Sequence, residues 1–241
     1  MKVRIEKDEL GIKEIPAEAY YGIQTQRSKE NFDIVQKPIS RNMIKALATI
    51  KKATARANCD AGLIDKKVSD AIALACDEII NGRLHGQFIV DLIQGGSGAG
   101  MNMNANEVIA NRAIEILGGV KGDYDIVHPN DHVNRAQSTN DVIPTAAKIT
   151  TAVLLRKAMF QLERFRDALM VKGEEFHDVI KMGRTQMQDA VPIRLGDEFA
   201  AYSQVSHCTS EVDVTDMLKD GENTIDVVVV KWCDGSYLED Q

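Results

Sequence analysis

Apolar residues between positions 40 and 82 recur every three or four residues, which is the spacing of amphipathic helices. Two helices are predicted. Ser40 is a suitable N-cap for the first helix, and Gly62 marks its end. The second helix begins near Asp65 and ends before Gly82. Their short connection predicts an αα-hairpin. The apolar faces consist of Ile44, Leu47, Ile50, Thr54 and Ala57 in the first helix and Val68, Ile72, Ala75 and Ile79 in the second.

A third helix is predicted after a glycine-rich turn at residues 95–100, and it ends at Gly118. Glycine permits positive φ angles and a close approach of the backbone to other groups. A dinucleotide loop is not expected here, because Met101 breaks the GxGxxG spacing and no phosphate-binding lysine follows. We expect the turn instead to present Asn102 and Asn104 to a neighbouring site.

A long helix is predicted from Pro144 to about His177, because this stretch contains no further proline and its first glycine is Gly173. A helix of roughly thirty residues is typical of a bundle, which can be shared between subunits. Its apolar side consists of Ile149, Val153, Phe160, Leu162, Phe165 and Leu169.

The two ends of the chain lack this helical pattern. Residues 1–40 are predicted to be irregular and to form an arm or a small cap. Near the other end, β-branched residues at 211–218 and 224–232 flank a KDGEN turn, which predicts two strands joined by a turn. The fold class expected is therefore mainly α, with a short β-strand tail.

The net charge, the apolar runs and the cysteine spacing limit which partners, locations and metal sites we expect. The 241 residues carry a net charge of -7, and the isoelectric point is near 5.3, which argues against nucleic acid or an anionic membrane as a partner. No apolar run is long enough to span a membrane, and the first residues do not resemble a signal peptide, so we expect a cytoplasmic protein. The sequence predicts neither a metal site nor a disulfide framework, because its cysteines are widely spaced: Cys59, Cys76, Cys208 and Cys233.

Residues 128–145 are the main candidate for a functional site, because almost no apolar side chain occurs among their first fourteen. Ser138, Thr139 and Asn140 lie just before the long predicted helix. Backbone N–H groups and the helix dipole favour an anion at such a position. The alternative is that these three side chains only cap the helix.

Three polar segments are predicted to stand at the entrances of helices: residues 95–104, residues 134–141 and residues 181–188. The last of these is expected to be a turn that runs into a helix through Pro192 and Leu195. The donors of the last two segments would suit a small dicarboxylate, and they could stabilise the dianion formed when a proton leaves the carbon next to a carboxylate. They are Ser138, Thr139, Asn140, Lys181, Arg184, Thr185 and Gln186.

No residue is an obvious general base for such a reaction. His128 and His132 are candidates, although a histidine in a polar turn is more often structural.

Four motifs in residues 1 to about 204 resemble the N-terminal part of the aspartate ammonia-lyases of the fumarase/aspartase superfamily. They are YYGIQTQRSKENF, QGGSGAGMNMNANEVIANRA, HPNDHVNRAQSTNDVIPTA and KMGRTQMQDAVPIRLGDEF. Thr139 and Gln186 resemble aspartase more than fumarase. The resemblance implies the helical-bundle fold of that superfamily, with residues 1–40 as a cap and residues 41–204 as the start of the bundle.

The resemblance also implies a reaction and a site. The reaction is the reversible elimination of ammonia from L-aspartate to give fumarate, through an aci-carboxylate and without an organic cofactor. A homotetramer is implied, with active sites built from three subunits. The substrate-binding residues implied are Ser138, Thr139, Asn140, Thr185 and Gln186, and weaker candidates are Lys181, Arg27, Asn104 and His132.

The sequence departs from the family pattern at three positions. Ala99 and Gly100 stand where the family usually has Thr-Ser, and Asp197 replaces a usual glutamine. The family's base is a serine on a mobile loop, which would come after residue 241. No catalytic residue is therefore assigned, and we expect the chain alone to have no measurable aspartase activity.

Residues 211–241 resemble a different family, namely the N-terminal jelly-roll domain of family 2 β-galactosidases. Residues 205–241 are therefore interpreted as a foreign β-rich fragment. Three alternatives to an aspartase-like lyase stay open: a fumarate hydratase, a non-catalytic hybrid fragment that binds or joins a full-length lyase, and a carbohydrate-binding module.

Overall fold

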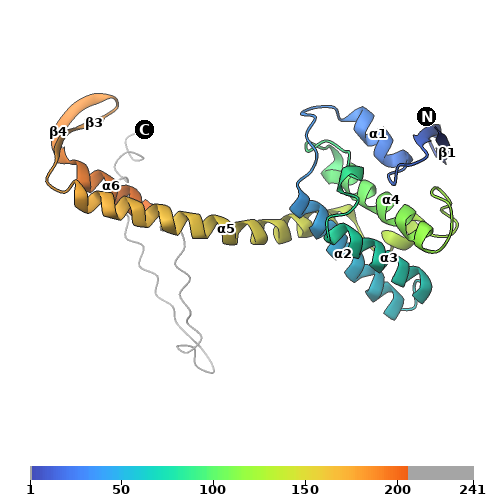
Figure 1. Ribbon diagram of the computed structural model, residues 1–241. Helices are drawn as coiled ribbons and strands as arrows, with labels where there is room; N and C mark the ends of the chain where they lie inside the picture. The colour runs from blue at the N-terminus through green and yellow to red at the C-terminus, as the bar shows by residue number, and fades with distance from the viewer. Residues whose placement is uncertain (1, 206–241) are drawn as a thin grey trace, which may run out of the picture. The chain divides into compact units, whose positions relative to one another are not determined.

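The computed structural model describes residues 2–205, which form parts of two compact units (Figure 1). The first unit is Met1–Phe160 and the second is Gln161–Gln241. Helices dominate the described part of the chain, so the prediction of a mainly α fold is confirmed. The predicted strands at 211–218 and 224–232 lie outside the described residues.

The N-terminal segment is more ordered than its sequence pattern indicated. Strands β1 (Val3–Asp8) and β2 (Gly11–Pro16) form an antiparallel hairpin, and α1 (Ile23–Asn31) follows. The prediction that residues 1–40 are irregular was therefore wrong, whereas their role as an arm or a small cap stays a prediction. Contacts with distant residues, which no local pattern reveals, hold both elements.

Helices α2 (Arg41–Asp60) and α3 (Lys66–Ile80) form the αα-hairpin that the sequence predicted. The hydroxyl of Ser40 caps α2 by accepting the backbone N–H of Met43 at 3.2 Å. The buried face of α2 differs from the predicted one in its second half. It passes through Lys51, Ala55 and Asn58, whereas Ala57 is exposed.

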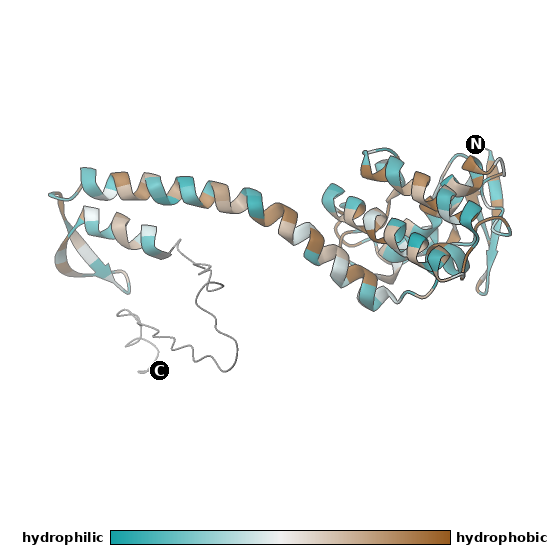
Figure 2. Ribbon diagram, turned by 90° about the horizontal axis from the view of Figure 1, so that it is seen from below, coloured by the Kyte–Doolittle hydropathy of each residue, from teal (hydrophilic) through white to brown (hydrophobic). Residues whose placement is uncertain are grey.

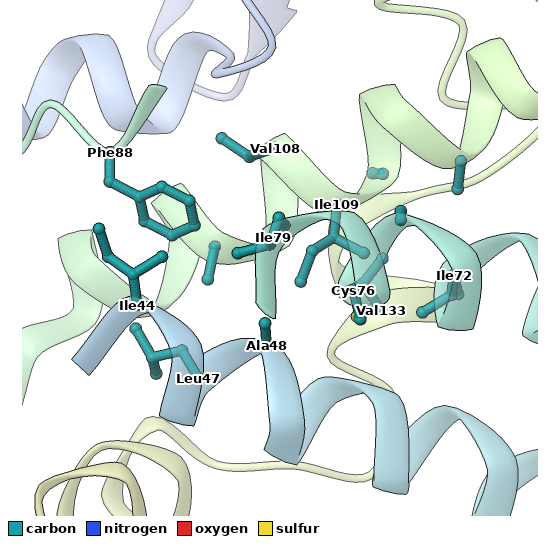
Figure 3. Packing of buried hydrophobic residues seen from close by; sticks show 14 of the residues in the cluster. Ile44, Leu47, Ala48, Ile72, Cys76, Ile79, Phe88, Val108, Ile109 and Val133 are labelled. Carbon is teal, nitrogen blue, oxygen red and sulfur yellow. The ribbon is translucent and has the colours of Figure 1, made fainter. Parts of the chain in front are cut away.

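Helix α4 (Ala99–Ile116) is the central element of the first unit. Short 3-10 turns at His85–Gln87 and Gly96–Gly98 precede it, and it packs against α1, α2 and α3. Val108 and Ile109 meet residues of α2 and α3 in the hydrophobic core (Figure 3). Most of its residues are buried, as expected for a helix that is covered on several sides.

A π-helical turn (Pro129–Val133) leads to α5 (Thr139–Glu175). The helix begins five residues before the predicted start at Pro144, which lies inside it. Because proline has no N–H, it cannot donate to Asn140, four residues earlier. Asn140 is exposed, so water can reach that carbonyl.

Apolar residues occur along the whole of helix α5 (Figure 2). Many of their side chains are exposed within this single chain. Leu169 alone of the predicted apolar side is buried, at 9% exposure. The other five residues of that side are exposed, namely Ile149, Val153, Phe160, Leu162 and Phe165.

The second unit consists, in its described part, of the end of α5, strands β3 (Ile180–Thr185) and β4 (Gln188–Arg194), and α6 (Leu195–Val205). The two strands form an antiparallel hairpin. The prediction of a helix through Pro192 was wrong, because Pro192 pairs with Met182 in this hairpin and the helix begins only at Leu195. The third polar segment is therefore a hairpin and not the entrance of a helix.

Candidate functional site

The first turn of α5 gathers the donors that the sequence singled out. Ser138 precedes the helix, and its hydroxyl accepts the backbone N–H of Asn140 at 3.2 Å. Its carbonyl accepts the N–H groups of Asp141 and Val142 at 3.0 and 3.1 Å. Ser138 thus caps the helix, in agreement with the alternative interpretation of this turn. Capping and anion binding are compatible, because the hydroxyl can still donate its own proton.

Thr139 is held by a side chain of the central helix. The amide nitrogen Nδ2 of Asn102 donates to Thr139 Oγ1 at 3.0 Å and to Asn134 Oδ1 at 3.1 Å. Asn102 is 1% exposed, and its own Oδ1 has no hydrogen-bond partner within the described residues. Thr139 Oγ1 accepts this bond and donates none to the described residues, so its hydroxyl proton is available to an incoming acceptor.

A buried lysine stands behind this turn, and sequence reasoning missed it. Lys51 is 0% exposed, and its ammonium donates to Asn134 Oδ1 at 2.8 Å and to Gln137 Oε1 at 3.0 Å. Burial lowers the pKa of Lys51 to about 7. The signal was present in the sequence, because Lys51 follows Ile44 by seven residues and so occupies a core position of the same helical stripe.

Asp141 adds a carboxylate to the first turn of α5. It weakens the positive potential at this helix end, so hydroxyl and amide donors have to provide most of the recognition of an anion.

The two candidate histidines have structural roles. Nδ1 of His128 accepts the backbone N–H groups of Asn130 and Asp131, at 3.2 and 3.1 Å. Nδ1 of His132 accepts the backbone N–H of His128 at 2.8 Å, and burial lowers the pKa of His132. The Nδ1 atom of each ring is therefore engaged by backbone N–H groups of the same turn.

Asn104 is also engaged within the fold. It is 0% exposed, its amide nitrogen donates to the carbonyl of Gln87 at 2.9 Å, and its oxygen accepts the N–H of Ile89 at 3.0 Å. Both groups of the Asn104 amide thus bind to the chain itself, and a contact of Asn104 with a ligand stays a prediction.

Arg27 lies on α1 and forms an ion pair with Asp8. The Nε and NH2 groups donate to the two carboxylate oxygens at 2.7 and 2.8 Å, and the guanidinium lowers the pKa of Asp8. Arg27 lines a pocket of about 680 Å³ together with Ser28, Gly95 and Gly100. Its charge is shared with Asp8, so it is not a free anion-binding cation.

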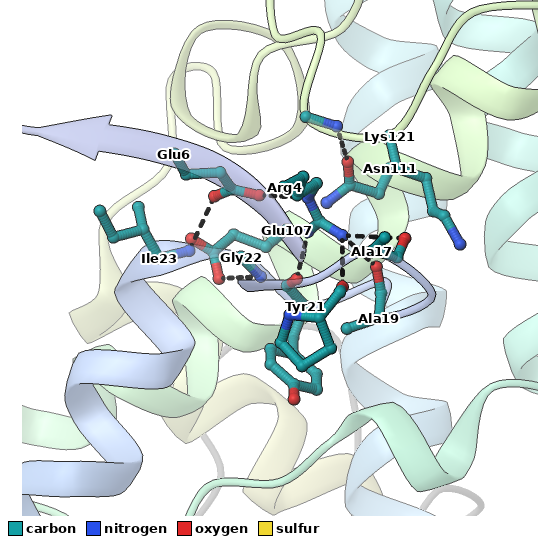
Figure 4. A network of polar contacts seen from close by, with 12 residues as sticks. Arg4, Glu6, Ala17, Ala19, Tyr21, Gly22, Ile23, Glu107, Asn111 and Lys121 are labelled. Carbon is teal, nitrogen blue, oxygen red and sulfur yellow. Dashed lines mark hydrogen bonds and ion pairs between the residues drawn. The ribbon is translucent and has the colours of Figure 1, made fainter. Parts of the chain in front are cut away.

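Helix α1 is fixed by buried carboxylates at its N-terminus (Figure 4). Glu107 accepts the N–H groups of Gly22, Gln24 and Thr25 at 2.8 to 3.0 Å, and the hydroxyl of Thr25 at 2.5 Å. Burial raises the pKa of Glu107, and these donors oppose the shift. The carboxylate compensates helix amides that would otherwise lack partners, which ties α1 to α4.

The remaining predicted residues lie on the β3–β4 hairpin of the second unit. Thr185 ends β3, and Gln186 with Met187 forms its two-residue loop, in which both have positive φ angles of 48° and 64°. Lys181 donates to Glu198 of α6 at 2.5 Å. Arg184 pairs with Asp189 at 3.0 Å. Thr185 and Gln186 are exposed, and their side chains are available to a ligand.

Residues 2–205 show neither a metal-binding cluster nor a membrane-spanning helix. These residues include no group of three or more histidine, cysteine, aspartate or glutamate side chains placed to bind a metal ion. In the same part of the chain, no helix combines the length and apolar character needed to cross a bilayer.

Comparison with known proteins identifies the class to which this arrangement belongs. Residues 11–215 match the family described as Lyase, and the chain belongs to that family. It is 57% identical over 202 residues to the aspartate ammonia-lyase of Bacillus subtilis (strain 168). The resemblance to aspartate ammonia-lyases, predicted from the four motifs, is confirmed.

Solved structures of related enzymes share the fold. The fumarate lyase:delta crystallin from Brucella melitensis in native form superposes with a TM-score of 0.76 at 48% identity, covering 86% of this chain and 49% of that one. The recombinant class II fumarase from Schistosoma mansoni superposes with a TM-score of 0.73 at 39% identity, covering 86% and 44%. The match to the Bacillus subtilis enzyme covers 84% of this chain and 42% of that enzyme, so the chain spans less than half of this relative.

Proposed function

We propose that this chain carries the first part of an ammonia-lyase site that acts on L-aspartate and releases fumarate. The observation that carries the proposal is the bond from Asn102 to Thr139 Oγ1, which leaves the Thr139 hydroxyl proton free at the N-terminus of α5. The 57% identity with an aspartate ammonia-lyase supports the choice of substrate.

The proposed chemistry is an elimination. A base removes a proton from the carbon next to one carboxylate of L-aspartate, and the electron pair moves onto the carboxylate oxygens. The ammonium group on the neighbouring carbon then leaves, and fumarate results. The hydroxyls of Ser138 and Thr139 and the amide of Asn140 donate to the carboxylate whose charge increases. Loss of one such donor typically costs about 2.7 to 4 kcal/mol of transition-state stabilisation.

Thr185 and Gln186 are proposed as further substrate contacts from the β3–β4 hairpin. Both residues of its loop have left-handed backbones, although residues with side chains rarely adopt them. Backbone strain of this kind is often found at functional sites. Lys181 and Arg27 are proposed only as more distant contributors, because each is already paired with a carboxylate.

Binding of ligands to the 241-residue chain tests the proposal. Fumarate and L-aspartate are added to ¹⁵N-labelled protein, with L-alanine as a control that lacks the second carboxylate. We expect the backbone amide signals of Ser138, Thr139 and Asn140 to shift with the dicarboxylates only. Thr139→Val should abolish the shifts. The matched control Thr145→Val, at an exposed position of the same helix, should retain them. Equal shifts with L-alanine would contradict the proposal.

A fumarate hydratase is the second candidate, favoured by the likeness to the class II fumarase from Schistosoma mansoni. Thr139 and Gln186 favour the ammonia-lyase, because the fumarase pattern has other residues there. Adding fumarate with and without ammonium to an active assembly that contains this chain separates the two. Formation of aspartate only with ammonium supports the lyase, and formation of malate supports the hydratase.

We also propose that the functional form is a homotetramer in which α5 packs against other helices. The support is the row of exposed apolar side chains on this helix, which a single chain leaves in water. The division into a lyase part at residues 1–204 and a foreign fragment at 205–241 is likewise retained as a proposal. Sedimentation of the purified chain tests the proposed tetramer. Sequencing of the source DNA across codons 190–241 tests the proposed junction between the lyase part and the foreign fragment.

A further inference from the structure

The turn at residues 134–137 has a conformation that its residues do not favour by themselves. Ala136 has a φ of 56°, in the left-handed region that residues with a Cβ atom rarely adopt. Such a backbone persists where surrounding contacts determine it. The turn directly precedes Ser138 and Thr139, so the contacts that hold it also set the positions of these two residues.

Helix α2 supplies contacts to this turn from one face. The ammonium of Lys51 donates to the side-chain oxygens of Asn134 and Gln137, and the amide of Asn58 donates to the carbonyl of Arg135 at 2.9 Å. Lys51 and Asn58 are seven residues apart, which places both on the same side of the helix.

The turn is closed by its own amide side chains. Asn134 Nδ2 donates to the carbonyl of Gln137 at 3.1 Å, and Gln137 Nε2 donates to the carbonyl of Val133 at 2.9 Å. Each of these amides can donate in this way only while its oxygen points toward Lys51. The ammonium therefore selects the orientation of both amides.

The orientation of the Asn134 amide also affects Asn102 and Thr139. Asn134 Oδ1 accepts from Lys51 and also from Asn102, whose Nδ2 group donates to Thr139 Oγ1. A reversed Asn134 amide would present its nitrogen to Asn102 Nδ2, and two donors would then face each other. The bond that directs the Thr139 hydroxyl thus depends on the lysine.

We propose that Lys51 is a positioning residue for the dicarboxylate site, acting through Asn134 and Asn102 to fix the direction in which Thr139 donates its proton. The identity of the ligand rests on the proposed function. The hydrogen-bond chain from Lys51 to Thr139 is seen in the structure and is independent of that function.

The surroundings of Lys51 make the hydrogen-bond chain from Lys51 to Thr139 sensitive to pH. The titratable group that acts on it from α3 is the Cys76 thiol, which stays neutral because burial raises its pKa. The 134–137 turn and α4 face it with the neutral amides of Asn134, Gln137 and Asn102, and it forms no ion pair with a carboxylate of the described residues. Burial lowers the pKa of Lys51 to about 7, so its ammonium loses a proton near neutral pH.

Nuclear magnetic resonance on the 241-residue chain tests the proposal without a ligand. The ¹³Cε signal of Lys51, the side-chain amide signals of Asn102 and Asn134, and the backbone amide of Thr139 are followed against pH. We expect one common midpoint. Lys51→Met should abolish the change at Thr139. The control Lys52→Met, which removes a neighbouring ammonium paired with Asp77 at 2.5 Å, should preserve it.

A second variant, Gln137→Glu, tests the positioning role of Lys51 even if Lys51→Met does not fold. Gln137→Glu places a carboxylate beside the ammonium in nearly the same space, and an opposite charge raises the pKa of a lysine by about one to three units. We expect the midpoint at Thr139 to rise with that of Lys51. The proposal would be overturned if the backbone amide signal of Thr139 did not change as Lys51 titrates, or if its midpoint were the same in Gln137→Glu.

Fumarate binding separates this proposal from the proposed function. Lys51→Met should weaken fumarate binding by about tenfold or more, the equivalent of one hydrogen bond to a charged group, whereas Lys52→Met should leave it unchanged. If the unaltered chain binds neither fumarate nor L-aspartate, the proposed function fails, and the common titration of Lys51 and Thr139 still decides the positioning role. Unchanged fumarate binding in folded Lys51→Met protein would count against that role.

Discussion

The hydroxyl oxygen of Ser28, on α1, occupies the space that a side chain at Gly100, on α4, would need. The same added Cβ atom would lie 2.7 Å from Gln94 Oε1. The Ser28 hydroxyl is buried and has no hydrogen-bond partner among the described residues. The serine on α1 therefore fills the space that Gly100 leaves without a side chain.

Gly100→Ala is expected to lower the free energy of unfolding by about 1–3 kcal/mol, because an added methyl group overpacks the contact between α1 and α4. Ser28→Gly should recover most of this loss, since it removes the two Ser28 atoms that the new methyl group would meet and leaves only Gln94 Oε1 close to it. Urea unfolding followed by circular dichroism measures the pair as a double-mutant cycle. Gly86→Ala is the control, because an added Cβ there meets nothing within 4 Å. Additive effects of the two substitutions would contradict the explanation.

Glu107→Gln is expected to lower the free energy of unfolding by about 1–3 kcal/mol or more. The glutamine would turn an NH₂ group toward backbone N–H groups of Gly22, Gln24 or Thr25, and buried donors would then lack acceptors. Hydrogen exchange of the α1 amides should increase most. Glu30→Gln, at an exposed glutamate of α1, should change stability by less than about 0.5 kcal/mol. Equal effects of the two substitutions would show that Glu107 does not anchor the helix.

Stability should rise as the pH increases above about 7 because of Lys51. Its pKa in the folded chain is lowered to about 7, from 10.5 in the unfolded chain. Below pH 7 both states hold the proton, and the cost of burying the ammonium is fully present. Between the two pKa values the unfolded chain binds more protons, so the free energy of unfolding gains up to about 1.4 kcal/mol per pH unit.

Urea unfolding at pH 6.5 and pH 8.5 measures this dependence. Lys51→Met should remove most of the difference between the two pH values, and Lys52→Met should keep it. The same difference in the unaltered chain and in Lys51→Met would assign the pH dependence to other groups.

Met187→Gly is expected to stabilise the β3–β4 hairpin by about 1 kcal/mol, because glycine adopts the left-handed backbone of this position without steric cost. Met187 is 94% exposed, so the substitution removes little packing. Hydrogen exchange of the β3 and β4 amides should slow. Met187→Ala keeps the Cβ atom and should not produce this gain. Faster exchange in Met187→Gly would indicate that the methionine side chain itself holds the loop.

Much of the helical fold follows from local patterns. Ser40 and Gly62 delimit α2 closely, and the αα-hairpin with α3 is confirmed. The start of α5 was misplaced because Pro144 was taken as its first residue, whereas proline is tolerated where the freed carbonyl reaches water. The hairpins at residues 3–16 and 180–194 were missed because long-range contacts and turn geometry stabilise them.

The candidate site was predicted in outline. The polar run at residues 128–145 pointed to Ser138 and Thr139, and the structure places both at the beginning of α5. Local sequence does not reveal that Asn102 donates to Thr139, because the two are thirty-seven residues apart. Local sequence does not reveal the hydrogen-bond partners of His132 and Asn104 for the same reason, since these partners come from the fold around them.

The sequence by itself determined the class of protein, helices α2, α3 and α4, and the position of the polar turn. These properties depend on residue spacing, caps and motifs, which act over a few neighbours along the chain. Only the tertiary structure decided which polar side chains are available to a ligand. Burial of Lys51 and the shared acceptor on Asn134 arise when α2, α4 and the turn before α5 pack together. Desolvation and hydrogen-bond direction depend on that packing, and they cannot be obtained from the order of the residues.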